Sequence, residues 1–263
     1  MYTRLLLLRA VTSPLRRLPG RGRLFIEPMR RMARRLKGTV VINDFDADVK
    51  FELDLAGDGD SAVFWYGSRD PVLLAWLEAA LSPGATLVDV GAGSGEVTLF
   101  AGKRVGPSGR GVAVELEEGP ADRLTRSLGL NGFDFVDVLR IPLGAAELRV
   151  VGDEDDGRGS SVDALLDEGW FGEIDVLRIA HPEPLAVVRG AAQTIESSQP
   201  FVVLEAPVGA GQPGREVLAL LERSDYRIYE LDRRGRPRAA PLAGLEGERR
   251  MIAAPTARRL PVP

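Results

Sequence analysis

The most regular polar–apolar pattern near the start of the chain lies in residues 49–55. From Val49 to Leu55 apolar and polar residues alternate without exception, which is the period-two pattern of a strand with one face in water. An apolar run at 39–42 precedes it, so we expect an antiparallel hairpin. Residues 57–60, all glycine and aspartate, are then typical of a turn. Asp70-Pro71 opens an apolar helix that runs to residue 81.

Beyond residue 84 short apolar runs alternate with helical patterns, as in a parallel sheet with crossover helices. We therefore predict an α/β fold with a doubly wound, mostly parallel, Rossmann-like sheet. A polar loop is expected at 152–161, and the basic run from Arg233 to Arg238 is expected to be an exposed loop. The expected strands are 86–90, 111–114, 136–140, 174–179, 201–204, 226–231 and 251–254, and the expected helices are 96–104, 120–130, 162–166, 185–195 and 215–223.

Composition excludes several kinds of site. The 263 residues are 44% hydrophobic and 27% charged, as in soluble globular proteins. The chain has no cysteine, which excludes disulfides, thiolate zinc sites, iron–sulfur clusters and cysteine nucleophiles. Its one histidine, His181, excludes a multi-histidine metal site. The acidic run 153–156 lies in a glycine-rich stretch and is typical of a solvated loop, so we predict no metal.

Charge is unevenly distributed along the chain. Of its 34 basic and 38 acidic residues, residues 1–38 hold eleven and one, which leaves 23 and 37 for the rest. A basic N-terminal arm thus precedes an acidic body. The arm could bind anionic lipid, nucleic acid, or the acidic body of the same or another subunit. The acidic body argues against a nucleic-acid partner.

The arm contains no apolar run long enough for secretion or for a membrane span. Its longest run, Leu5 to Leu8, lies between two arginines and is far shorter than the roughly 20 residues that a spanning helix needs. We therefore expect a cytoplasmic protein, with peripheral contact between residues 1–38 and an anionic membrane as an open alternative. The pattern does not predict an oligomeric state.

A glycine-rich turn is the most informative motif. The strand at 86–90 runs into Gly91, Gly93 and Gly95 and then into a helix, so backbone amides at a helix N-terminus face the edge of the sheet. A dinucleotide fingerprint needs its third glycine where this chain has Glu96, and a pyrophosphate would meet that acid. Twenty residues after Gly95, Glu115 follows the next strand, where such folds bind ribose hydroxyls with an acid.

These residues resemble a known class. Residues 88–95 with Glu115 look like the cofactor motif of class I S-adenosylmethionine-dependent methyltransferases, and residues 60–255 are similar to the FkbM-type family of these enzymes. The series that carries the resemblance is 66–67, 81–84, 124–131, 141–144, 161–166, 174–179, 187–191 and 201–205. With the charge count and the strand pattern, the resemblance divides the chain into the basic N-terminal arm at 1–38 and a methyltransferase domain at 39–263, with a hairpin region at 39–70 and a core at 71–263. It implies S-adenosylmethionine as cofactor, bound by Asp89, Gly91, Ala92, Gly93, Gly95, Glu115 and Leu143.

One segment departs from that family. The family typically has Lys-Ile-Asp-Val-Glu-Gly after its fourth strand, whereas this chain has Arg-Ile-Ala-His-Pro-Glu at 178–183. The strand-end aspartate is absent at the edge where a substrate would meet the methyl group. The resemblance implies methyl transfer to a hydroxyl of a small molecule or sugar. His181 is the predicted base because its ordinary pKa lies near neutral, and Glu183 and Glu205 are predicted as orienting groups or bases.

Two other functions stay open. A methyltransferase-like chain that binds cofactor, or nothing, and serves as a silent partner subunit would also explain the altered segment at 180–184. A nicotinamide oxidoreductase is disfavoured because the third glycine of the fingerprint is misplaced.

Overall fold

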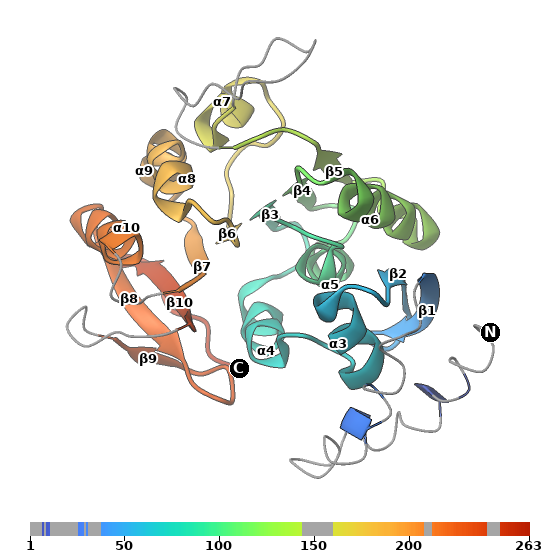
Figure 1. Ribbon diagram of the computed structural model, residues 1–263. Helices are drawn as coiled ribbons and strands as arrows, with labels where there is room; N and C mark the ends of the chain where they lie inside the picture. Colours follow the sequence, from blue (N-terminus) through green and yellow to red (C-terminus); the bar gives the residue numbers. More distant parts are fainter. Residues whose placement is uncertain are drawn as a thin grey trace.

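The architecture comes from a computed structural model of the chain, which describes residues 7, 9, 10, 26–28, 30, 38–143, 160–207, 212–240 and 248–263. Within these ranges the main sheet has eight strands in the order β5-β4-β3-β6-β7-β10-β8-β9 (Figure 1). Pairs from β5 to β7 are parallel, whereas β10 is antiparallel to both β7 and β8. The strands are β3 (Thr86–Val90), β4 (Arg110–Val114), β5 (Val136–Leu139), β6 (Val176–Ile179), β7 (Phe201–Pro207), β8 (Tyr226–Leu231), β9 (Pro237–Ala239) and β10 (Glu248–Pro255).

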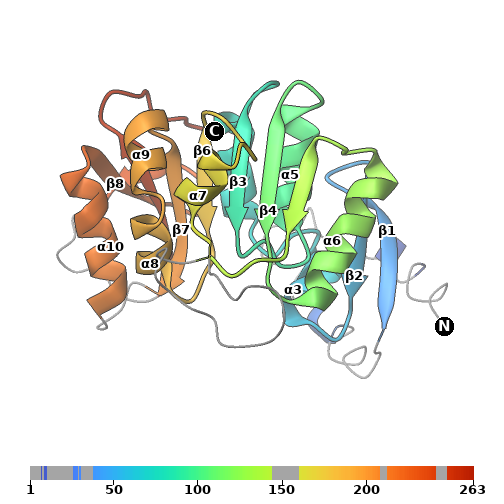
Figure 2. The same cartoon turned by 90° about the horizontal axis from the view of Figure 1, so that it is seen from above.

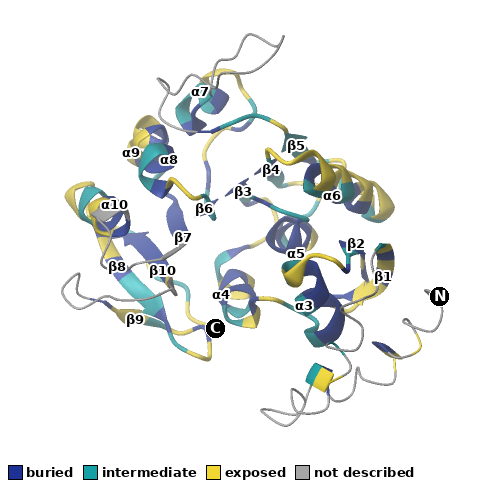
Figure 3. Ribbon diagram, in the orientation of Figure 1, coloured by how far each residue is buried: buried dark blue, intermediate teal, exposed yellow. Residues whose placement is uncertain are grey.

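Helices cover both faces of this sheet. Leu87 packs with α4, α5 and α6, and its neighbour Val88 packs with α7 to α10, because successive strand side chains point to opposite faces. The central strands are buried on both sides (Figure 3). The predicted doubly wound α/β fold is therefore confirmed. The helices are α4 (Pro71–Ala80), α5 (Glu96–Val105), α6 (Glu118–Asn131), α7 (Val162–Asp167), α8 (Pro184–Arg189), α9 (Ala192–Ser198) and α10 (Gln212–Arg223).

The predicted hairpin is present and packs beside α6 (Figure 2). It consists of β1 (Thr39–Phe45) and β2 (Val49–Asp54), paired antiparallel in a sheet of their own. Asn131 at the end of α6 donates to the Lys50 carbonyl at 2.7 Å and accepts the Lys50 amide at 2.9 Å. Ser127 accepts the Glu52 amide at 3.0 Å. These bonds hold β2 against the body.

Three sequence predictions need correction. Residues 57–60 are not a simple turn, because helix α3 (Asp58–Tyr66) begins there. Its first-turn acids suit a helix N-terminus, and the apolar residues after them are buried. The helical stretch 185–195 is two helices, α8 and α9, separated at Gly190. The basic run 233–238 forms a turn and enters strand β9, although all four of its arginines are exposed.

Two described parts of the basic arm pack on the body of the same chain. Arg9 is buried, donates to Asp44 at 2.9 Å and to the Val63 carbonyl at 3.3 Å, and stacks on Phe64. Arg30 pairs with Asp58 of α3 at 3.2 Å. Of the possible binding partners of the arm, Arg9 and Arg30 therefore contact the acidic body of the same chain. Among the described residues, no helix is long and apolar enough to cross a membrane.

Most of the predicted polar loop at 152–161, including the acids at 153–156, lies outside the described residues.

Candidate functional site

The glycine turn joins β3 to α5 at the carboxyl edge of the parallel strands. Gly91, Gly93 and Gly95 all have positive φ angles, of 77°, 59° and 101°, which glycine adopts readily. A Cβ at Gly91 would collide with the carbonyl of Ala180, and one at Gly95 would collide with Leu124. A Cβ at Gly93 would meet nothing within 4 Å. The outer two glycines therefore permit close packing, and Gly93 borders open space.

That open space is a cavity of about 360 Å³. The glycine turn forms one wall, and helix α3, which reaches this edge of the sheet (Figure 2), forms another. The size is within the range of small-molecule sites. Its position matches the general rule that doubly wound sheets bind ligands beyond the carboxyl ends of their strands. The lining side chains with polar groups are Asp60, Arg69, Ser94, Glu96, Glu117, Arg123 and Arg178.

Glu115 lies directly behind the glycine turn. Its carboxylate accepts the Gly93 amide at 2.7 Å and the Glu117 amide at 2.9 Å. One acid thus ties the end of β4 to the turn after β3. Gly91, Ala92 and Gly93 line the cavity, whereas Gly95 and Glu115 do not.

The other two predicted cofactor residues are buried. Asp89 has no exposed surface and accepts the Thr98 hydroxyl at 2.6 Å. Leu143 belongs to the apolar core on the α7–α10 side and pairs by an isolated bridge with Ser160. Neither lines the cavity, although Asp89 bonds Arg178, which does.

A buried ion-pair array forms the floor of the cavity. Arg178 of β6 donates to Asp89 of β3 at 2.5 Å and, through Nε, to Glu205 of β7 at 2.7 Å. Burial alone would lower the pKa of Arg178, but the two carboxylates outweigh it and raise that pKa above its ordinary value. Burial would raise the pKa of Glu205, but the charge of Arg178 leaves it lowered. Glu205 is thus held as a carboxylate.

Arg69 extends this array toward the mouth of the cavity. Its Nη2 lies 3.3 Å from Glu205, and its Nε lies 3.8 Å from Glu96 at the start of α5. A Cβ at Gly59 of α3 would touch the Arg69 side chain at 3.7 Å, so Arg69 passes between α3 and β7. Glu96 Oε1 also accepts the Arg69 amide at 2.8 Å and the Ser68 hydroxyl at 2.6 Å. Burial is the main cause that raises the pKa of Glu96.

A second buried acid faces the cavity from α3. Asp60 accepts the Asp54 amide at 2.7 Å and the hydroxyl of Ser94. Arg123 of α6 places Nε 3.6 Å from Asp60, and no described residue forms a hydrogen bond with that buried nitrogen. Burial raises the pKa of Asp60, and these donors offset only part of the effect.

The predicted base lies outside the cavity lining. His181 follows β6, and its Nδ1 accepts the Glu183 amide at 3.1 Å. The neutral ring must then carry its proton on Nε2, because Nδ1 acts as the acceptor. Glu183 is exposed and also does not line the cavity. Of the three predicted catalytic residues, Glu205 alone belongs to the ion-pair array at the floor.

Five charged residues that line the cavity were not predicted from the sequence, namely Asp60, Arg69, Glu96, Arg123 and Arg178. Arg178 and Glu96 lie in motifs that drew notice, and each carries a charge next to a strand end or a helix start. The other three come from α6 and from the region of α3, a helix that the glycine–aspartate composition concealed. Among the described residues, no group of three or more acidic or histidine side chains has a metal-binding arrangement.

No family model matches the chain. Solved structures similar to it include a SAM-dependent O-methyltransferase from Thermotoga maritima, with 16% identity, a TM-score of 0.47, and coverage of 84% of this chain and 79% of that one. Precorrin-6y C5,15-methyltransferase from Geobacter metallireducens has 14% identity, a TM-score of 0.47, and coverage of 72% and 88%. Methyltransferase FkbM from Methylobacillus flagellatus has 14% identity, a TM-score of 0.45, and coverage of 75% and 55%. Such distant likenesses carry no argument about the chemistry of this chain.

Proposed function

We propose that this chain is an S-adenosylmethionine-dependent methyltransferase of the FkbM type that methylates a hydroxyl on a small molecule or sugar. The observation that carries the proposal is the pairing of the Gly93 turn with Glu115 beside the cavity. Open space at Gly93 lets a ligand approach the backbone, and the acid is at the strand end where ribose is bound in doubly wound folds.

The charged residues of the cavity also fit this cofactor. Its amino-acid end carries an ammonium and a carboxylate, and the cavity is lined by the Asp60 carboxyl group and by Arg123, whose Nε lies 3.6 Å from it. Gly91, Ala92 and Gly93 would border the nucleoside. When bound, the cofactor supplies an activated methyl group on a sulfonium. The protein then has to align the acceptor and exclude water.

A hydroxyl acceptor must also lose its proton, and Glu96 is well placed to receive it. Glu96 lines the cavity, and its raised pKa is the direction that a base near neutral pH needs. Its Oε1 accepts two hydrogen bonds, whereas Oε2 lies 3.8 Å from Arg69 Nε, and the Asp70 amide also donates to the carboxyl group. We assign Oε2 of Glu96 as the proton acceptor, ahead of His181.

Calorimetry with S-adenosylhomocysteine tests the cofactor assignment. The wild-type protein should bind it with micromolar affinity, and Gly93→Ala should weaken binding at least about tenfold, or ~1.4 kcal/mol, because the new methyl group enters the cavity. Gly132→Ala is the matched control, since Gly132 has a similar φ of 66° and equally open surroundings at the end of α6. Absence of binding to the wild type, or equal binding by Gly93→Ala, would overturn the assignment. Heat from NAD instead would favour an oxidoreductase.

A silent partner subunit is the second candidate. It is favoured by Ala180, which stands where the resembled family has an aspartate at the strand end. Such a protein would bind S-adenosylhomocysteine yet release none when incubated with cofactor and a pool of small-molecule acceptors. Release that depends on Glu96 would favour the enzyme.

A further inference from the structure

Three arginines surround one carboxylate on the α4 side of the sheet. Arg178 and Arg69 both contact Glu205, at 2.7 Å and 3.3 Å. Arg250 of β10 lies opposite Glu205 in the strand register, and its charge contributes to the lowered pKa of that acid. Each arginine also pairs with a second acid, Arg178 with Asp89, Arg69 with Glu96 and Arg250 with Asp70, so the cluster joins three guanidinium groups to four carboxyl groups.

Two of these acids, Asp89 and Asp70, are buried, whereas Glu96 lines the cavity beside Arg69. Asp89 is completely buried beneath Arg178, and Asp70 is 4% exposed, caps α4 and pairs with Arg250. By contrast, the side chains of Arg69 and Arg250 are 49% and 43% exposed. A molecule that enters from solvent beside Arg69 therefore meets its N–H donors before it meets Asp89 or Asp70.

Arg178 contributes one further donor at the floor. Its Nε and Nη1 are bonded to Glu205 and Asp89, and no hydrogen bond to a described residue occupies Nη2. Among the described residues that nitrogen is not one of the fully enclosed polar atoms without a partner. Arg178 also lines the cavity. Nη2 is thus a donor held in place by two ion pairs and available at the cavity floor.

We propose that the methyl acceptor carries a carboxylate or phosphate group, which binds between Arg69 and the Nη2 of Arg178. Guanidinium groups recognise such anions through parallel N–H donors, and groups already fixed by Glu205 lose little freedom when they bind. This inference rests on the proposed function, because it names the substrate class of the same cavity.

The distribution of charge around the cavity fits an anionic acceptor beside a cationic methyl donor. The acids Glu115, Glu117 and Glu118 cluster where β4 leads into α6, next to the glycine turn. Arg178 of β6 and Arg69 before α4 also line the cavity, and Arg123 of α6 lines it beside Asp60. A sulfonium is favoured on the acidic side and an acceptor anion on the arginine side. The anion would also lie near Glu96, since Arg69 contacts both.

The test is an anion titration of the intact chain, with and without S-adenosylhomocysteine. Inorganic phosphate and malonate serve as probes for the two anion sources, thermal stability is the readout, and sodium chloride keeps the ionic strength constant. We expect at least one probe to stabilise the wild type in a saturable manner. Arg69→Gln should weaken that binding at least tenfold, and Arg69→Lys should have an intermediate effect because lysine keeps the charge without the fork.

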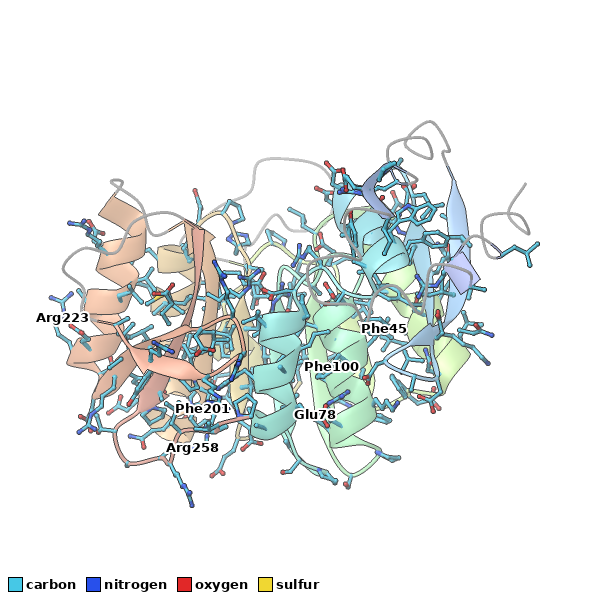
Figure 4. All side chains as sticks on the ribbon, turned by 90° about the horizontal axis from the view of Figure 1, so that it is seen from below. Phe45, Glu78, Phe100, Phe201, Arg223 and Arg258 are labelled. Carbon is cyan, nitrogen blue, oxygen red and sulfur yellow. The ribbon has the colours of Figure 1, made fainter. Side chains whose placement is uncertain are left out.

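Arg259→Gln is the matched control. Arg259 is exposed and follows Arg258, which stacks on Phe201 at the opposite edge of the sheet (Figure 4). This variant should respond to anions as the wild type does. No saturable response to either probe, or an equal response from Arg69→Gln, would overturn the proposal. The titration is also done without S-adenosylhomocysteine. Its result can therefore be interpreted even if the protein does not bind the cofactor.

Discussion

The two walls of the cavity are built in different ways. The glycine wall comes from residues 89–117, one strand–turn–helix unit and the end of the next strand, and it lines the cavity with the turn at 91–93 and with side chains such as Ser94 and Glu96. The arginine wall combines Arg69, Arg178, Glu205 and Arg250, which are far apart in the sequence and meet only through the sheet order. The first wall is therefore specified locally, whereas the second depends on the complete fold.

The walls also differ in what they require energetically. Positive φ angles cost glycine little, so the glycine wall is almost free of strain. The arginine wall buries charges whose desolvation roughly cancels their attraction, so its integrity depends on every partner being present. The comparison predicts that single substitutions will harm the arginine wall more than the glycine wall.

The largest expected effect follows Arg178→Met. It leaves Asp89 buried without a counter-charge, which typically costs about 3–5 kcal/mol. Urea unfolding measures it. Arg126→Met is the control, because Arg126 pairs with Glu52 on the surface and should cost less than about 1 kcal/mol. Equal losses in the two variants would mean that the buried array does not differ energetically from a surface pair.

The pH dependence of stability should separate the two acids that Arg69 contacts. Glu96 has a raised pKa, so its contribution is present below the ordinary value of 4.5 and is lost as pH rises through the folded-state pKa. Glu205 has a lowered pKa, so its contribution is present above that ordinary value and is lost as pH falls through the folded-state pKa.

Melting temperatures measured from about pH 3 to about pH 8 check these signs, because this range begins below the ordinary carboxylate pKa values and ends well above them. Relative to wild type, Glu96→Gln should gain stability as pH rises, and Glu205→Gln should lose it. Parallel curves for both variants would show that the two acids experience the same environment, contrary to the ion-pair geometry.

The difference between the walls also explains how far the sequence could be interpreted. The strands of the sheet and the glycine turn at 91–95 are each specified by a short stretch of sequence, so both were predictable. Helix α3 was missed because its first residues have turn composition and are held by tertiary bonds, such as that from the Asp54 amide to Asp60. The pairing of Arg178 with Glu205 requires β6 beside β7, and no local pattern contains that neighbour relation.

The smallest expected effect concerns His181, the base suggested by the sequence. Its Nδ1 accepts the Glu183 amide, so its neutral form presents a proton donor rather than an acceptor at Nε2. His181→Gln should therefore change turnover less than about threefold, whereas a general base typically contributes 10²–10⁴-fold. Glu96→Gln is the comparison and should lose about a hundredfold or more while S-adenosylhomocysteine still binds. A hundredfold loss of turnover in His181→Gln, with turnover of Glu96→Gln unaffected, would identify His181 as the base. The loop at 181–183 would then have to rearrange when substrate binds, so that Nδ1 is released from the Glu183 amide.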